Sequence, residues 1–308
     1  MLISVVIPLY NEVESLPPLH EKLTKNLKTL GHDYEIIYVD DGSTDGSFEV
    51  LEDIHAKDKH TKVIQFRRNF GKSAGMVAGF AEAAGEIIFT LDADLQDDPD
   101  EMPRFLEKLD EGYDFVSGRK FPRLDPLSKT LPSKLANGAI RLTTGVKVHD
   151  MNSGFKAMRR EVTEQLHLYG DMHRYVPVLA HWRGFRIAEI NVKHHPRQFG
   201  KSKYGVGRLS RGLFDFMTII FLTQFNRRPL HFFGWFGIVS FGLGFLIDAY
   251  LSVLWLMGET IGHRPLLTLG TLLIIIGVQF FSFGLLAEMV NYESYSREKN
   301  YTIRKKLE

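Results

Sequence analysis

The sequence predicts an α/β fold, in which a mostly parallel sheet has helices on both faces and is followed by a C-terminal two-helix transmembrane hairpin. Three observations support this: apolar runs alternate with helical patterns over residues 1–205, acidic clusters follow two of these runs, and two long apolar segments lie beyond residue 230. The absence of cysteine among the 308 residues excludes disulfides and thiolate metal sites, and a net charge of +1 gives no reason to expect nucleic acid.

Five apolar runs predict the strands. Several are apolar throughout, which is typical of strands covered on both faces. Leucines at three-four spacing before Gly31 predict a helix after the first run, and residues near 47–58 and 73–85 predict two more. The runs are ISVVIP (3–8), YEIIYV (34–39), KVIQF (62–66), EIIFTL (86–91) and DFVSG (114–118). In such sheets ligands bind at the carboxyl ends of the strands.

The segment LDADLQDDPD (91–100) follows the fourth run directly. Asp92 and Asp94 lie on the same side if the extended geometry persists, and Gln96 adds an amide oxygen. Carboxylate and amide oxygens suit Mg²⁺ or Mn²⁺, so we expect a divalent-metal site. A solvated acidic turn is the alternative, because D-x-D also occurs by chance.

The later acids of this segment have a structural explanation. Asp98 before Pro99 predicts a helix start, with Asp98 as the N-cap and Pro99 as the first helical residue. We expect Asp97, Asp98 and Asp100 to belong to this helix start, where the helix dipole favours negative charge.

A second acidic strand end is VDDGSTDGS (39–47). Asp40 or Asp41 is a candidate to hydrogen-bond a nucleobase or ribose, and a plain turn with a cap at Asp45 or Ser47 is the alternative for the rest. NFGKSAG is not a P-loop, since Phe66 stands where that motif requires glycine, and no G-x-G-x-x-G follows the first strand. No H-E-x-x-H is present, so a zinc hydrolase is not expected.

Two segments are basic. Residues 119–133, rich in Pro, Lys and Arg, predict a mobile loop, and residues 193–208, KHHPRQFGKSKYGVGR, are a candidate to bind an anion. The second segment either attracts anionic lipid heads or binds one phosphate, with Arg197 as a bidentate donor. We favour phosphate binding, because three glycines suggest a loop that wraps a ligand.

The apolar segments at about 232–257 and 265–290 each hold one acidic residue, Asp248 and Glu288, and each is long enough to cross a membrane. A buried helical hairpin is the alternative. Arg and Lys flank the pair on the domain side and the tail side, so the large domain is expected to be cytoplasmic. Residues 206–229 predict an amphipathic helix, either on the membrane surface or packed on the domain. The expected divisions are 1–205, 206–229, 230–291 and a basic tail at 292–308.

The motifs VVIPLYNE, VDDGSTD, RRNFGKSAG, LDADLQDDPD, SGRK, DMNSGFK, HRY and HHPRQFGKSKY together resemble the inverting glycosyltransferases of family two. Within that family, the chain is similar to the membrane-bound polyprenyl-phosphate glycosyltransferases over nearly its whole length. The resemblance implies a GT-A type, Rossmann-like sheet. It also implies a metal-dependent transfer of a hexose from a nucleotide-sugar to a polyprenyl phosphate, such as undecaprenyl or dolichyl phosphate, at an inner membrane.

The resemblance also assigns roles to single residues. Those implied to contact the nucleotide-sugar are Pro8, Tyr10, Glu12, Asp40 and Asp92. Those implied to hold the metal are Asp94, Gln96 and Asp92. Those implied to act in catalysis are Asp92, Asp94, Asp150 and Arg119. Those implied to hold the acceptor phosphate are Arg119, Lys129, Ser133 and Arg197. Asp150 matches an acid that acts as a base or orients the acceptor. Lys129 stands where some members have arginine, and the motif DLQDDPD carries one acid more than the family pattern.

The donor and the assembly remain open from sequence. We expect UDP-glucose, because the two spans and the overall pattern resemble the glucosyltransferases more than the mannose synthases. A homo-oligomer, with a tetramer as candidate, is a hypothesis that the resemblance and Asp248 suggest, because a membrane acid is expected to face another helix or a partner. A processive or soluble-acceptor polysaccharide synthase and an inactive sugar-nucleotide-binding scaffold are the alternatives. The first is disfavoured by the absence of Q-x-x-R-W, where the chain has AHWRGF.

Overall fold

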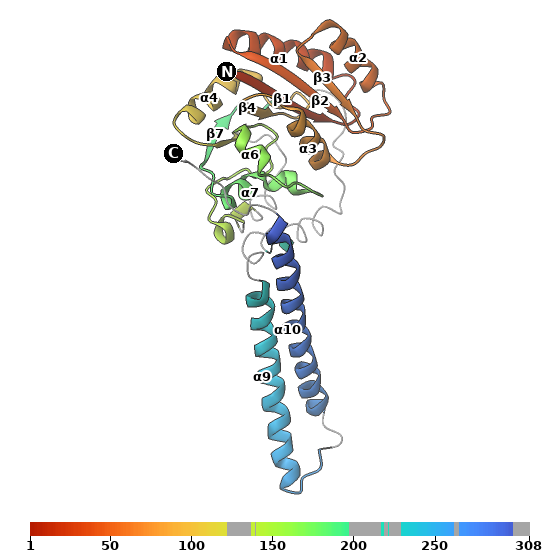
Figure 1. The fold of residues 1–308 in the computed structure, drawn as a ribbon, viewed down its shortest axis with the longest axis vertical. Coiled ribbons are helices and arrows are strands. Elements are labelled where there is room, and N and C mark those ends of the chain that lie inside the picture. The colour runs from red at the N-terminus through yellow and green to blue at the C-terminus, as the bar shows by residue number, and fades with distance from the viewer. Residues whose placement is uncertain are drawn as a thin grey trace. The chain divides into compact units, whose positions relative to one another are not determined.

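The computed structural model of the chain describes residues 1–121, 137–138, 140–196, 217–218, 221, 229–261 and 265–297. The chain divides into two compact units, Met1–Ile219 and Ile220–Glu308. The first unit contains a seven-stranded sheet of order β3-β2-β1-β4-β6-β5-β7, and the second contains two long helices (Figure 1).

Six strands of the sheet run in the same direction, and one opposes them. The parallel pairs are β1 with β2 and β4, β2 with β3, and β5 with β7, whereas β6 is antiparallel to both β4 and β5. The strands are β1 Leu2–Leu9, β2 Asp33–Asp40, β3 Thr61–Gln65, β4 Ile87–Thr90, β5 Phe115–Lys120, β6 Lys156–Arg159 and β7 Ile187–Val192.

The helices of the first unit mostly connect these strands. They are α1 Leu16–Leu30, α2 Ser47–Lys57, α3 Lys72–Glu82, the 3-10 turn η1 Pro99–Glu101, α4 Met102–Asp110, α6 Arg160–Glu164, the 3-10 turn η2 Met172–Tyr175 and α7 Val176–Trp182. Helix α1 ends at Gly31, whose φ of 69° is a left-handed conformation that glycine adopts without strain.

The alternation of side chains along β1 explains how the sheet is covered. Ile3, Val5 and Ile7 pack into the large core with leucines of α1, whereas Val6 points to the opposite face and meets α3. Gly79 of α3 lies so close to Val6 that a Cβ at this position would overlap it. Helices α1 and α2 therefore lie on one side of the sheet and α3 on the other (Figure 1).

Three aromatic side chains form the centre of the core below β4. Phe89 of β4, Phe105 of α4 and Phe155 before β6 contact one another, with the rings of Phe105 and Phe155 at 4.3 Å between centroids. All three side chains are completely buried. Since Phe155 directly precedes β6, this contact fixes the place where that antiparallel strand enters the sheet.

The five predicted strands and the predicted class of fold are confirmed, with boundaries shifted by one or two residues. The sequence analysis did not predict β6 and β7. Strand β6 has only four residues, KAMR, and β7 reads IAEINV, in which only the second half alternates. Short strands of this kind are stabilised by pairing with strands distant in sequence, and a local pattern does not show such pairing.

The predicted helix start at Pro99 is also confirmed. Asp98 is the N-cap of η1, and its carboxylate accepts a hydrogen bond from the backbone N–H of Asp100 at 3.1 Å. Asp100 lies in the first turn, as expected. The interpretation of Asp97 is wrong, because Asp97 is buried against Lys120 and does not cap the helix.

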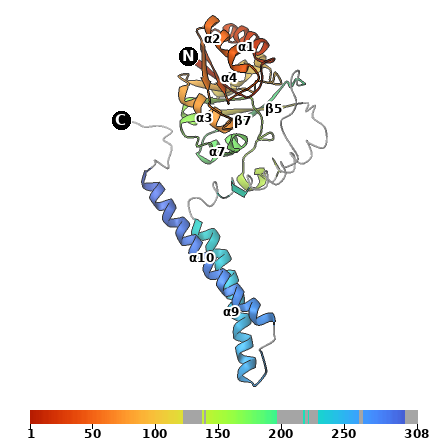
Figure 2. The same cartoon turned by 90° about the vertical axis from the view of Figure 1, so that its right-hand side faces the viewer.

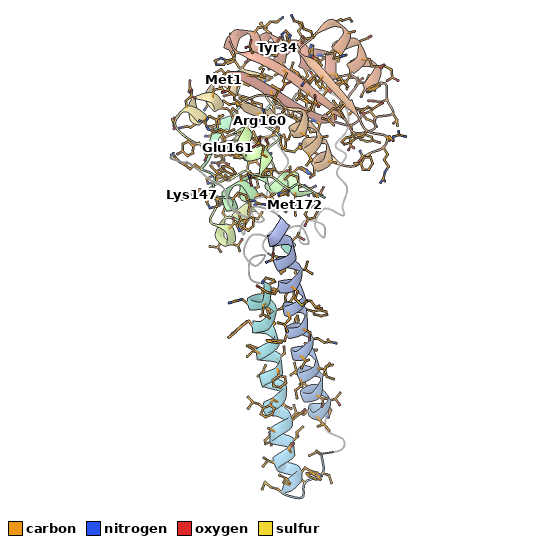
Figure 3. The ribbon with its side chains drawn as sticks, in the orientation of Figure 1. Met1, Tyr34, Lys147, Arg160, Glu161 and Met172 are labelled. Carbon is orange, nitrogen blue, oxygen red and sulfur yellow. The ribbon has the colours of Figure 1, made fainter. Side chains whose placement is uncertain are left out.

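The second unit consists of α9 Pro229–Leu256 and α10 Pro265–Arg297. Both helices (Figure 2) are long and apolar enough to cross a membrane, at Pro229–Leu256 and Pro265–Asn291. Their side chains project outward along most of their length (Figure 3). Gly237 packs against Gly277, and Gly244 against Gly270, so the two backbones approach closely. Most of the predicted amphipathic helix at 206–229 lies outside the described residues.

Asp248 faces α10 within this hairpin. Thr271 Oγ1 donates to Asp248 Oδ2 at 3.4 Å, and the carboxylate lies directly over Gly270. The expectation that this acid faces another helix is confirmed, and the helix belongs to the same chain. A role in oligomerisation stays a hypothesis.

We predict that Phe105→Ala lowers the free energy of unfolding by about 3–5 kcal/mol, because it leaves a cavity between Phe89 and Phe155. Thermal unfolding of the purified protein followed by circular dichroism measures the change. Tyr169→Ala, whose ring is 59% exposed, is the matched control and should leave the unfolding temperature unchanged. Equal unfolding temperatures for the two variants would contradict the packing described here.

Candidate functional site

The topology gathers the chemically active side chains at one edge of the sheet. The carboxyl ends of the six parallel strands lie there, and because β6 runs in the opposite direction, its amino end lies there too. Lys156, the first residue of β6, is in register with Thr90 of β4 and Ser117 of β5. The segment that precedes β6, with Asp150, is thereby brought to the acidic loop that follows β4.

Asp92 lies at the centre of this edge and forms an ion pair with Lys72, the first residue of α3. Burial opposes its ionisation, but the positive charges of Lys72 and Lys120 outweigh burial and hold the pKa of Asp92 well below its usual range. Gly154 lies against the carboxylate so closely that a Cβ at this position would overlap it. The carboxylate of Asp92 is therefore ionised and fixed in position.

Asp94 and Gln96 occupy the loop between β4 and η1. Asp94 is buried, and its carboxylate accepts a hydrogen bond from the backbone N–H of Gln96 at 3.2 Å. Leu95 between them has a φ of 61°, the left-handed region that is uncommon for a residue with a side chain. Such conformations persist where the surrounding structure enforces them, and they cluster at functional sites.

The donor set of this loop fits a hard divalent cation. Mg²⁺ and Mn²⁺ take oxygen ligands, and Mg²⁺ is commonly held by one or two carboxylates together with substrate phosphates. Among the described residues, no group of three or more His, Asp or Glu side chains is arranged to hold a metal. Asp94 and Gln96 would therefore hold the ion together with oxygens of a bound phosphate.

A second ion pair, more deeply buried than the first, joins Asp97 to Lys120 at the end of β5, with 3.7 Å between Nζ and Oδ1. Neither carboxylate oxygen of Asp97 accepts a hydrogen bond from the described residues, and burial raises its pKa against the opposing effect of Lys120. Burial of Lys120 disfavours its charge, yet the surrounding acids more than compensate and raise its pKa. These acids are Asp97, Asp92, Asp94 and Asp150.

Lys156 is a third lysine of the cluster. Its ammonium donates to the backbone oxygen of Ser153, and burial together with the nearby charge of Lys72 lowers its pKa to about 8. Ser73, next to Lys72, lies 3.1 Å from His173 Nδ1 and accepts the backbone N–H of His173. Burial and Lys72 lower the pKa of His173 to about 3, so this neutral histidine anchors the start of α3.

The loop after β1 and the loop after β2 are joined by hydrogen bonds. Asn11 accepts the backbone N–H of Thr44 at 2.8 Å, and Ser47 Oγ accepts the N–H of Glu12 at 2.9 Å. The predicted nucleotide contacts Pro8, Tyr10 and Glu12 all lie on β1 or this loop.

The two adjacent aspartates at the end of β2 have different environments. Asp40 is buried and accepts the N–H of Ser43 at 3.0 Å. Asp41 accepts the N–H groups of Phe70 and Gly71 at 2.6 and 2.9 Å, so it holds the loop before α3. Of the two candidates for nucleotide binding, Asp41 thus has a structural role, and Asp40 remains the candidate.

The predicted acceptor residues are only partly described. Arg119, at the end of β5, is partly exposed, with its guanidinium 5.7 Å from the ring of Phe121. Asp150 is buried, and its backbone N–H donates to Glu189 Oε1 at 2.9 Å. Lys129, Ser133 and Arg197 lie outside the described residues, so their roles stay predictions.

Sequence reasoning missed Lys72, Lys120, Lys156 and the Ser73–His173 pair. All three lysines belong to motifs of the resemblance, RRNFGKSAG, SGRK and DMNSGFK, but none was given a role. The position of Lys72 shortly after the third strand, at the same sheet edge as the acidic loop, is the signal that could have indicated a partner for Asp92. The roles of Lys120 and Lys156 were not found, because the strand β6 that joins them to the site was not predicted.

Comparison with known proteins identifies relatives over most of the chain. Residues 4–167 match the family model "Glycosyl transferase family 2". The chain is 36% identical over 310 residues to dodecaprenyl-phosphate galacturonate synthase of Rhizobium johnstonii, covering 98% of this chain and 92% of the relative. It is also 36% identical over 308 residues to undecaprenyl-phosphate 4-deoxy-4-formamido-L-arabinose transferase of Klebsiella pneumoniae, covering 98% and 93%.

Two solved structures have a similar fold over about seven-tenths of this chain. Glucosyl-3-phosphoglycerate synthase of Mycobacterium tuberculosis, in complex with Mn²⁺, UDP and glucosyl-3-phosphoglycerate, aligns with a TM-score of 0.54 and 21% identity over 72% of this chain and 79% of that chain. Mannosyl-3-phosphoglycerate synthase of Rubrobacter xylanophilus aligns with a TM-score of 0.54 and 17% identity over 71% and 72%.

We predict that Lys120→Met destabilises the fold by about 3–5 kcal/mol, because Asp97 is left buried without a counter-charge. Folded Asp97 retains its proton to higher pH than the unfolded chain does, so the loss should shrink as the pH falls from 8 to 5. Thermal unfolding at both pH values measures this. The double variant Lys120→Met, Asp97→Asn should recover most of the stability, and failure to recover would contradict the pairing.

Proposed function

Because this chain belongs to glycosyl transferase family 2, we propose that it transfers a sugar from a nucleotide-sugar donor to a polyprenyl phosphate. The observation that carries the proposal is the meeting of the D-x-D acids with three lysines at the edge of the sheet where ligands bind. A reaction that joins two phosphate-bearing substrates needs fixed positive charge at such a place. The names of two relatives that cover 98% of the chain mention polyprenyl phosphates.

The donor end of the site is assigned to the loops after β1, β2 and β4. Asp40 would bind the nucleoside, with Pro8, Tyr10 and Glu12 beside it. Asp94 and Gln96 would hold Mg²⁺ or Mn²⁺, which offsets charge on the diphosphate. A structural neighbour whose name includes Mn²⁺ and UDP supports a metal in this fold. Asp92, held by Lys72 and Gly154, is fixed for a contact with the sugar nucleotide.

The acceptor end is assigned to the basic side of the edge. A phosphate monoester has a second pKa near ~6, so at neutral pH the lipid phosphate is already an anionic nucleophile and needs little help from a general base. Asp150 therefore orients the acceptor. The residues proposed to hold its phosphate are Arg119, Lys129, Ser133 and Arg197. In-line attack at the anomeric carbon inverts configuration and gives a β-linked product from an α-linked donor.

The identity of the transferred sugar is a more specific part of the proposal. UDP-glucose was expected from the sequence, whereas the relatives' names mention galacturonate and a formamido-arabinose. We therefore extend the candidate donors from UDP-glucose to UDP-uronates.

The membrane arrangement follows from the two candidate spans and their flanks. Arg227 and Arg228 precede α9, and several basic residues follow α10, which favours a cytoplasmic catalytic unit on a multi-pass inner-membrane protein. A lipid-linked acceptor would be available at that surface. A homo-oligomer stays a prediction.

The decisive experiment incubates purified full-length protein with undecaprenyl phosphate, Mg²⁺ or Mn²⁺, and a panel of UDP-glucose, UDP-glucuronate, UDP-galacturonate and GDP-mannose. We expect one UDP-sugar to give a glycolipid that mass spectrometry detects. Asp94→Asn should lower the rate by about 10²-fold or more, because a neutral amide binds the divalent ion poorly. Asp53→Asn, an exposed acid on α2, is the control and should retain full activity.

Three outcomes would oppose this proposal. Transfer to a soluble acceptor such as 3-phosphoglycerate, without any glycolipid, would place the chain with its structural neighbours in function as well as fold. Binding of a UDP-sugar without turnover would support the inactive scaffold. Full activity of Asp94→Asn would refute the metal assignment.

A further inference from the structure

We propose that His195 is a positioning residue, whose imidazole fixes the loop from Asp94 to Asp98 in the shape that binds the metal and diphosphate of the donor. The inference rests on the function proposed above and adds a role for His195, which lies in the motif HHPRQFGKSKY but which neither that motif nor the comparisons assign to any function. Its evidence is a set of contacts between two segments that are almost a hundred residues apart in the chain.

The chain that leaves β7 runs directly alongside the acidic loop. Asp97 and His194 form an antiparallel bridge, and the backbone N–H of His195 donates to the carbonyl oxygen of Gln96 at 3.0 Å. Two hydrogen bonds therefore hold the backbone of Gln96, a proposed metal ligand. Its carbonyl oxygen accepts from His195, and its N–H donates to the carboxylate of Asp94.

The side chain of His195 adds a second attachment at the end of the loop. Its Nε2 lies 2.9 Å from Asp98 Oδ2, while Lys22 Nζ lies 2.7 Å from Asp98 Oδ1. The carboxylate of Asp98 thus has a nitrogen of a basic side chain at each oxygen, and His195 Nε2 is placed to donate to it.

This loop needs attachment at both ends. Leu95 adopts a left-handed conformation that is unfavourable for a residue with a side chain, so the loop keeps its shape only where contacts enforce it. Asp98 is also the N-cap of η1, through the N–H of Asp100. His195 therefore connects the loop to a rigid point at the start of the next helix.

The same segment connects the donor loop to the acceptor side of the site. Strand β7 pairs with β5, with Asn191 opposite Arg119 and Val192 opposite Lys120. Two residues after His195 the chain reaches Arg197, a proposed contact of the acceptor phosphate. The segment that carries His195 therefore contacts both the strand of Arg119 and the loop of the proposed metal ligands.

Other contacts hold this segment without the imidazole, so its removal should not unfold the protein. Arg104 donates to the carbonyl oxygen of Asn191 at 2.8 Å, and the N–H of Lys193 donates to Glu101 Oε1 at 3.4 Å. The N–H of Phe121 donates to the carbonyl oxygen of Val192 at 3.3 Å. Since these bonds are made by other residues, His195→Ala tests the imidazole alone.

The experiment compares His195→Ala, His195→Gln and His32→Ala in the full-length protein. His32 is an exposed histidine that lies just before β2 and serves as the matched control. Calorimetric titration of UDP in saturating Mn²⁺ measures the Kd without any turnover. We expect His195→Ala to weaken UDP binding by about tenfold or more, because the loop that carries the proposed metal ligands loses its attachment at Asp98, and loss of contacts that orient metal ligands has effects of this size.

The remaining readouts separate positioning from a loss of fold. Glutamine keeps an N–H donor near the place of Nε2, so His195→Gln should bind UDP nearly as well as the unaltered protein. In the transfer assay, His195→Ala should raise the KM for the donor sugar more than it lowers kcat. His32→Ala should match the unaltered protein, and all variants should unfold at the same temperature.

An unchanged Kd in His195→Ala would overturn the inference, and so would a His195→Gln variant that binds as weakly as the alanine variant. These failures are distinct from a failure of the proposed function. A protein that makes glycolipid with an indifferent His195 refutes only the positioning role. A protein that makes no glycolipid, but loses Mn²⁺-dependent UDP binding in His195→Ala, refutes only the acceptor.

Discussion

The pairing of carboxylates with lysines at the end of β4 is the interaction on which the rest of the site depends. Like charges in one short loop repel, and burial increases the cost of each charge. Lys72 offsets the partly exposed Asp92, and Lys120 offsets the buried Asp97, so the loop can hold both acids close together. The charge of Asp98 is offset differently, by Lys22, His195 and the start of a helix. Neighbouring acids of the segment thus have different partners.

The direction of β6 explains why these charges meet. In a sheet with only parallel strands, the amino end of every strand would lie at the opposite edge from the ligand. Because β6 is antiparallel to β4 and β5, its first residue, Lys156, lies between their carboxyl ends. Gly154 and Phe155 precede it, one in contact with Asp92 and the other packed in the aromatic core. The same short segment therefore contacts both the candidate site and the aromatic core.

The helical hairpin is held by a different kind of interaction. Water is absent from the hydrocarbon region, so helices associate there by close packing and by interhelical hydrogen bonds. Glycines at the crossing of α9 and α10 allow this approach, and Asp248 finds Thr271 on the facing helix. The proposed lipid-linked acceptor explains why this chain has two candidate membrane spans, since they would keep the enzyme at the membrane that contains its substrate.

The sequence by itself determined the class of fold, the five central strands, the helix start at Pro99, the two apolar helices and the D-x-D loop. These depend on local patterns, such as hydrophobic periodicity, a capping residue or a run of apolar residues. Such patterns lie within a short stretch of sequence, so they can be identified without knowledge of the tertiary contacts. Only the tertiary structure decided that Asp97 pairs with Lys120, that Lys156 joins the site through β6, and that His195 holds Asp98. Each of these contacts joins residues distant in sequence, and a charge shows no preference for a partner until the topology of the sheet brings one within reach.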